Sequence, residues 1–138
     1  MCASRTVSSP PSPTPTVAVV DDDAAARRAL GRILRAHDLR VASFASAEEL
    51  LQAYAATLPS CLVLDVVLPG MSGPDLLERL RSAPGCPPAI FVTGRIDAAQ
   101  TLRQRGMEQV PCLQKPFEPA LLVTTVRRAL ELLQPRDA

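Results

Sequence analysis

Five side chains suited to phosphate chemistry follow apolar runs of this 138-residue chain. They are Asp21, Asp22, Asp65, Thr93 and Lys115, which is the only lysine. Carboxylates that lie close together stay ionised only with a cation among them, and oxygen ligands without His or Cys suit Mg²⁺. A carboxylate at such a centre can attack phosphorus and form an aspartyl phosphate. An ammonium and a hydroxyl can then stabilise the phosphoryl oxygens.

Each of these residues also has an ordinary structural explanation. The acidic pair Asp21 and Asp22 could cap the helix that follows and complement its dipole. Asp65 could be a loop carboxylate, Thr93 a strand-end hydroxyl, and Lys115 a solvated charge. We favour the functional interpretation because all five residues are expected at the same edge of one sheet.

Alternating hydrophobic patterns predict the elements that position these residues. Apolar runs predict buried strands, and apolar residues at helical spacing predict helices. Strict alternation of strands and helices predicts a doubly wound α/β fold, with helices on both faces of a parallel sheet. Ligands of such folds bind beyond the carboxyl ends of the strands. The expected strands span 16–20, 41–44, 61–65, 89–93 and 110–114, and the expected helices span 24–36, 46–58, 73–83, 97–106 and 118–133.

Several residues indicate where the helices begin and end. Ser46 with Glu49 three residues later predicts a capping box. Pro74 suits the first turn of the third helix, and Gly106 suits the end of the fourth.

Composition favours one domain with an aliphatic core. The chain is 47 % hydrophobic but only 3 % aromatic, and its net charge is +1. A charge so close to zero gives no general attraction for nucleic acid or an anionic membrane. The four cysteines form no C-x-x-C pair and there is one histidine, which argues against a zinc site. Without an apolar signal core or a membrane-length apolar run, we expect a reduced, cytoplasmic protein.

The two ends of the chain are expected to lie outside the folded domain. Residues 1–15 are rich in Ser, Pro and Thr and predict a disordered tail. The domain is expected over residues 16–134, followed by a short tail over residues 135–138.

Four segments together resemble a known family. "VVDDD", "LVLDVVLPGMSG", "IFVTG" and "QKPF" are similar to the signature segments of the response-regulator receiver domain of two-component signalling. Their order and intervals agree with that family over residues 16–134. The resemblance implies a (βα)5 flavodoxin-like sandwich whose parallel strands are ordered 2-1-3-4-5. The fifth strand then lies at an edge, where Pro111 is tolerated.

The resemblance also implies a role for each candidate residue. Asp65 would be the phosphoacceptor and a ligand of Mg²⁺. Asp22 would bind Mg²⁺ directly, Asp21 mostly through water, and the backbone carbonyl of Val67 would be a further ligand.

Three other positions match the family around the site. Thr93 would be the switch hydroxyl, and Lys115 would bind the phosphoryl group. The Lys115–Pro116 peptide is expected to be cis. Pro69 and Gly73 match the turn that follows the acceptor.

The chain departs from the family pattern at the residue three before the lysine. Receivers usually carry an aromatic ring or His there, and this chain has Cys112. We therefore expect output through the loop after Thr93 and the fourth helix, or a relay role.

Because Gly106 comes early, the fourth helix is expected to be short or partly unwound. The residues two after the acceptor and two after the threonine, Val67 and Arg95, favour a long-lived phosphorylated state.

The leading functional hypothesis is a stand-alone receiver in a phosphorelay. A histidine kinase or phosphotransfer protein would supply the phosphoryl group, and the signal would pass by protein–protein contact. Such a module catalyses its own phosphorylation and dephosphorylation and is not otherwise an enzyme. We expect no effector domain after residue 134 and therefore no direct DNA binding. The face formed by the fourth helix, fifth strand and fifth helix is the expected contact surface, including for a homodimer.

Two alternatives remain open. A degenerate receiver would bind partners without phosphorylation, which Cys112 leaves open. A phosphatase of the haloacid dehalogenase type would require an Asp two residues after its nucleophile, and Asp65 is followed by two valines. Asp21 and Asp23 have that spacing, but Ala follows them.

Overall fold

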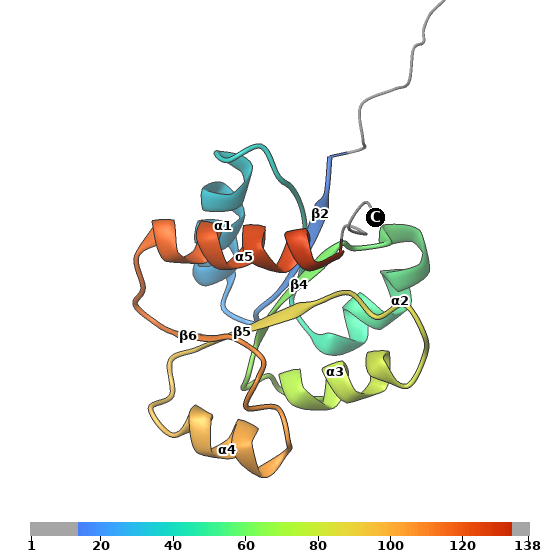
Figure 1. Cartoon of the computed structure of the whole chain (residues 1–138), viewed down its shortest axis with the longest axis vertical. Helices are drawn as coiled ribbons and strands as arrows, with labels where there is room; N and C mark the ends of the chain where they lie inside the picture. Colours follow the sequence, from blue (N-terminus) through green and yellow to red (C-terminus); the bar gives the residue numbers. More distant parts are fainter. Residues whose placement is uncertain (1–13, 134–138) are drawn as a thin grey trace, which may run out of the picture.

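The computed structural model describes residues 14–133, which form a five-stranded parallel sheet between two layers of helices (Figure 1). The sheet order is β3-β2-β4-β5-β6, which is the predicted order 2-1-3-4-5 in chain sequence. The predicted doubly wound fold is therefore confirmed. Its strands are β2 (Thr16–Val20), β3 (Arg40–Phe44), β4 (Cys61–Asp65), β5 (Ala89–Thr93) and β6 (Cys112–Gln114).

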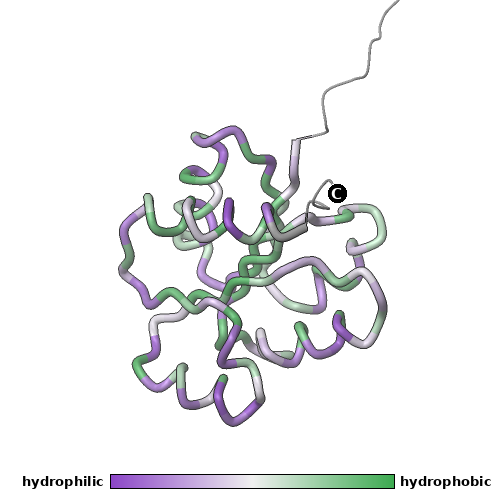
Figure 2. Tube along the Cα trace, viewed as in Figure 1, coloured by the Kyte–Doolittle hydropathy of each residue, from purple (hydrophilic) through white to green (hydrophobic). Residues whose placement is uncertain are grey.

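The helices divide between the two faces because side chains of each strand alternate in direction. Val17 and Val19 of β2 pack in one core cluster with residues of α1 and α5. Ala18 and Val20 pack in a second cluster with residues of α2, α3 and α4. Figure 2 shows hydrophobic residues along the central strands between these layers. The helices are α1 (Ala24–Arg35), α2 (Ala47–Thr57), α3 (Gly73–Arg81), α4 (Ala98–Gln104) and α5 (Pro119–Leu133).

Helix caps agree with the sequence in part. The Ser46 side chain accepts a hydrogen bond from the Glu49 N–H, so Ser46 is the N-cap of α2 as predicted. The Glu49 carboxylate, however, accepts from the N–H of Ala45 rather than that of Ser46, so the predicted capping box is displaced by one residue. A reciprocal box stands at α3 instead, between Ser72 and Asp75.

The last strand and the fourth helix are shorter than their predicted ranges. β6 begins at Cys112, not at residue 110, and Pro111 lies just outside it. The Pro111 carbonyl still accepts a hydrogen bond from Phe91 at 2.8 Å, while proline has no N–H to extend the strand. α4 has 7 residues and is followed by Gly106 at φ 72°, which confirms the expected short helix.

Almost all of the two predicted tails lies outside the described residues. The tail predicted over residues 1–15 lies outside them except for Thr14 and Pro15, and the Pro15 carbonyl accepts a hydrogen bond from Arg40. Residues 135–138 also lie outside. Within residues 14–133, none of the helices has both the length and the apolar character that crossing a bilayer requires.

The turn after β4 depends on a glycine. Gly73 opens α3, and its N–H donates to the carbonyl of Val66 at 3.2 Å. A Cβ at this position would overlap the backbone carbonyl oxygen of Asp65. The chain can therefore fold back over Asp65 only where a side chain is absent.

We predict that Gly73→Ala lowers the free energy of unfolding by about 2 kcal/mol, since the overlap forces backbone to move. Urea unfolding measures the change. Gly94→Ala is the matched control, because a Cβ at Gly94 meets nothing within 4 Å. Equal stability of the two variants would contradict the prediction.

Candidate functional site

Three carboxylates meet at the carboxyl ends of two neighbouring strands. Asp65 is the last residue of β4, and Asp21 and Asp22 directly follow β2, which pairs with β4. One carboxylate oxygen from each lies within 4.8 Å of the other two. Asp21 is fully buried and Asp65 is 8 % exposed, whereas Asp22 is exposed to solvent. The structure thus brings together the three acidic side chains that the sequence singles out.

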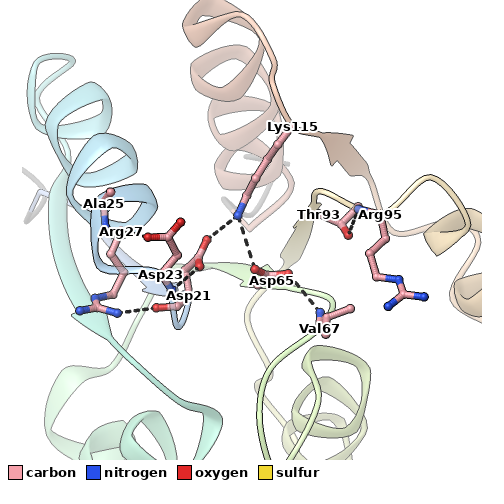
Figure 3. Close-up of polar contacts among 9 residues, drawn as sticks. All are labelled: Asp21, Asp23, Ala25, Arg27, Asp65, Val67, Thr93, Arg95 and Lys115. Carbon is pink, nitrogen blue, oxygen red and sulfur yellow. Dashed lines mark hydrogen bonds and ion pairs between the residues drawn. The ribbon is translucent and has the colours of Figure 1, made fainter.

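The Lys115 ammonium lies between two of these carboxylates (Figure 3). Its Nζ is 2.7 Å from Asp21 Oδ2 and 3.4 Å from Asp65 Oδ2. The backbone N–H of Lys115 donates to the Thr93 carbonyl at 2.7 Å, which fixes the start of this side chain beside β5. The Lys115–Pro116 peptide is cis, as predicted. No motif of the sequence predicts the shorter of the two contacts, the ion pair between Lys115 and Asp21.

Thr93 lies on the other side of Asp65 from Asp21 (Figure 3). Its side chain is buried, with 1 % exposure, and its hydroxyl accepts a hydrogen bond from the Arg95 N–H at 3.0 Å. The Arg95 guanidinium is exposed and pairs with Asp97 at 3.2 Å. Val67 donates its N–H to Asp65 Oδ1 at 3.0 Å, and this apolar residue is 47 % exposed.

This convergence of carboxylates, ammonium and hydroxyl has a match in a known family. The model of the response regulator receiver domain matches residues 17–127. The chain belongs to this family.

Two relatives are similar to this chain over most of its length. Nodulation protein W of Bradyrhizobium diazoefficiens is 42 % identical over 115 residues, which cover 83 % of this chain and 51 % of that protein. The C4-dicarboxylate transport transcriptional regulatory protein DctR of Rhodobacter capsulatus is 34 % identical over 120 residues, which cover 83 % and 59 %. The chain thus spans little more than half the length of these relatives.

Solved receiver structures share the fold. A response regulator receiver protein from Burkholderia phymatum is 36 % identical with a TM-score of 0.72, and the match covers 88 % of this chain and 99 % of that one. The BeF3-activated DrrB receiver domain is 27 % identical with a TM-score of 0.73, covering 86 % and 98 %.

The electrostatics of the receiver site follow from burial. Burial raises the pKa of Asp65 and the charge of Asp21 adds to this, while the Val67 N–H and Lys115 act in the opposite direction. The net pKa of Asp65 lies above its ordinary value. Burial alone would lower the pKa of Lys115, but the hydrogen bond to Asp21 and the two carboxylate charges outweigh it and leave that pKa raised. The ammonium therefore stays charged, and the Asp65 carboxylate is ionised at a cost.

The donor set fits a hard divalent cation. Asp21, Asp22 and Asp65 offer oxygen atoms alone, and no His or Cys belongs to this group. Oxygen ligands of high charge are those that Mg²⁺ prefers. The exposed carboxylate of Asp22 leaves the group open to solvent, which suits an ion that keeps several waters.

Two residues of the site were not predicted from the sequence. Asp23 caps α1 by accepting from the Ala25 N–H at 3.0 Å, and its own N–H donates to Asp21 Oδ1 at 2.9 Å. An Asp directly before a helix is a typical N-cap, so this role had a signal. Arg27 donates from Nη1 to the Asp21 carbonyl at 2.7 Å, and nothing in the local pattern indicates it.

The position that carries an aromatic ring in most receivers lies at the start of the edge strand. Cys112 is exposed there.

The short helix α4 is held at its carboxyl end by Arg105, whose guanidinium is 2.8 Å from both Asp75 and Glu78 of α3. An ionic contact therefore joins α4 to the helix that follows the Asp65 loop.

We predict that Asp65→Asn stabilises the protein in the absence of Mg²⁺. The raised pKa of Asp65 means that its ionised form destabilises the folded state at neutral pH. The variant should gain about 1 kcal/mol at pH 7. As the pH falls toward about 4, the folded wild type takes up a proton before the unfolded chain does, so the gain should shrink.

Urea unfolding at a series of pH values measures this difference. Asp75→Asn is the control of opposite sign, because hydrogen bonds from Arg105 and Ser72 lower the pKa of Asp75. That variant should be slightly less stable than wild type at pH 7. An Asp65→Asn advantage that grows on acidification would contradict the prediction.

Proposed function

We propose that this receiver domain accepts a phosphoryl group on Asp65 from a histidine kinase or phosphotransfer protein and signals by protein–protein contact. The observation that carries the proposal is the position of the Lys115 ammonium between Asp21 and Asp65, beside a third carboxylate. This arrangement supplies a nucleophile, a cation site and a phosphate-binding charge within one small volume.

Asp65 is oriented for attack by its own loop. The Val67 N–H holds Oδ1, and Oδ2 faces Lys115. In the transfer an Asp65 oxygen forms the new bond to phosphorus, and the donor nitrogen leaves with the electron pair of the broken bond. The chain returns to its starting state when water cleaves the aspartyl phosphate.

Mg²⁺, when bound, neutralises charge on the carboxylates and the phosphoryl oxygens. Asp22 and Asp65 would hold it directly, Asp21 through water, and the Val67 carbonyl would complete the protein ligands. The oxygen-only donor set supports this assignment.

Lys115 and Thr93 would bind the transferred group. Lys115 can keep its 2.7 Å contact with Asp21 while it exchanges its longer contact with Asp65 for a phosphoryl oxygen. The Thr93 hydroxyl accepts from Arg95, but its own hydrogen has no acceptor among residues 14–133. A buried hydroxyl with an unused hydrogen is ready to donate to a phosphoryl oxygen.

Output is proposed to pass through the loop after Thr93 and through α4, since Cys112 cannot act as a large ring. The α4–β6–α5 face is the proposed contact surface. Phosphorylation-independent binding is the competing function, and the observation that favours it is also Cys112.

We predict that acetyl phosphate with Mg²⁺ adds one phosphoryl group to the chain, seen by intact-protein mass spectrometry. Asp65→Asn should gain none. Lys115→Arg should keep the fold and be impaired in the switch, because a planar guanidinium does not replace a compact ammonium. Absence of any gain with acetyl phosphate and with a phosphorylated histidine donor would support phosphorylation-independent binding instead.

We further predict a phosphorylated state that lasts minutes or longer. The Val67 side chain has no polar group to position a water, and the Arg95 guanidinium is turned to Asp97. Loss of the label after donor removal, followed by mass spectrometry, measures the lifetime. Val67→Asn, which adds a polar group at this position, should shorten it. Hydrolysis of the wild type within seconds would be inconsistent with this prediction.

A further inference from the structure

The loop that carries Asp21 and Asp22 is held by hydrogen bonds that do not involve the Asp22 carboxylate. Asp21 Oδ1 accepts from the Asp23 N–H, and the Asp23 side chain accepts from the Ala25 N–H. The Asp22 carboxylate, in contrast, accepts no hydrogen bond from any described residue and is exposed. Its position is therefore set by the backbone on either side of it.

Arg27 fixes that backbone from the first turns of α1. Its Nη1 donates to the Asp21 carbonyl oxygen at 2.7 Å (Figure 3). The backbone N–H of Arg27 donates to the Asp23 carbonyl at 2.9 Å. The Asp21 carbonyl belongs to the rigid peptide plane that also contains the Asp22 N–H. A bond to this oxygen thus restrains the direction in which the Asp22 side chain leaves the chain.

The arginine acts on the backbone and not on the acidic group itself. Within residues 14–133, Arg27 forms no ion pair with a carboxylate. The carboxylates of Asp22 and Asp65 consequently remain available to a cation, although a guanidinium lies close by.

We propose that Arg27 is a positioning residue for the divalent cation, which it serves by orienting the Asp21–Asp22 peptide so that the Asp22 carboxylate faces Asp65. This inference rests on the Mg²⁺ binding in the proposed function. It assigns to Arg27 an effect opposite to that of its charge, because a nearby positive charge alone weakens the binding of a cation.

Orientation of the peptide by Arg27 strengthens Mg²⁺ binding, whereas its charge weakens it, so a measured change in Mg²⁺ affinity distinguishes the two effects. The Mg²⁺ dissociation constant of the full, unphosphorylated chain is measured by isothermal titration calorimetry at fixed ionic strength. Arg27→Gln removes the charge together with the guanidinium that donates to the carbonyl, and we expect it to bind Mg²⁺ about tenfold more weakly, the size typical of outer groups that orient metal ligands. Binding as tight as or tighter than wild type would overturn the proposal.

Arg28→Gln is the matched control. Arg28 is the next residue of α1, is exposed, and forms no ion pair within the described chain. It should bind Mg²⁺ at least as tightly as wild type. A loss equal to that of Arg27→Gln would assign the effect to a general destabilisation of α1 and overturn the positioning role.

Arg27→Lys supplies the rescue. A lysine keeps the charge and can still donate to a carbonyl, so it should bind Mg²⁺ more tightly than Arg27→Gln does. Charge alone predicts the reverse order, and that order would refute the proposal.

Melting temperatures without Mg²⁺ establish that each variant folds. Should Arg27→Gln not fold, Arg27→Lys is compared with wild type instead. We expect Arg27→Lys to bind Mg²⁺ about threefold more weakly than wild type does. Unchanged binding would contradict the proposal. A wild-type chain that binds no Mg²⁺ would instead contradict the proposed function.

Discussion

The ion pair between Lys115 and the fully buried Asp21 is the contact on which the site depends. A carboxylate out of contact with solvent is tolerated only with a partner charge and hydrogen bonds. Lys115 supplies the charge at 2.7 Å and the Asp23 N–H a hydrogen bond. Since β4 and β5 lie between β2 and β6, the lysine side chain must reach across the ends of both strands. β5 ends in Thr93, which is small and buried.

The close approach of three carboxylates at the site destabilises the fold. Burial opposes ionisation of Asp65, and the charge of Asp21 opposes it further. A protein selected for stability alone would not place three carboxylates within 4.8 Å of each other. Natural proteins commonly accept such a loss where activity requires it. Here the loss falls at strand ends, while the two aliphatic clusters on either side of the sheet supply the stability.

The fold and the residue types of the site can be predicted from the sequence. They depend on the hydrophobic period of each strand and helix and on the order of these elements along the chain. Valine-rich runs between amphipathic helices dictate the sheet, and the carboxyl ends of its strands dictate where Asp21, Asp65, Thr93 and Lys115 meet. The cis peptide at Lys115–Pro116 was expected from family resemblance, not from physics.

What the sequence does not reveal are contacts set by side-chain rotamers and by local backbone direction. The bond from Arg27 to the Asp21 carbonyl joins residues six apart with no recognised spacing. The shift of the Glu49 contact from Ser46 to Ala45 and the start of β6 after Pro111 are of the same kind. Each depends on one hydrogen-bonding group that a periodic pattern does not encode.

The brevity of α4 has a thermodynamic consequence. Seven residues are too few for a helix to be stable without its neighbours, because nucleation is unfavourable and few bonds repay it. Of these residues only Ala98 and Leu102 are buried. α4 is thus held by two buried apolar side chains and the Arg105 ion pairs, so few interactions oppose its movement. In the proposed function, a phosphoryl group would need only to change the weights of conformers that differ in the position of α4, and a small bond rearrangement at Thr93 would be amplified without a large moving ring.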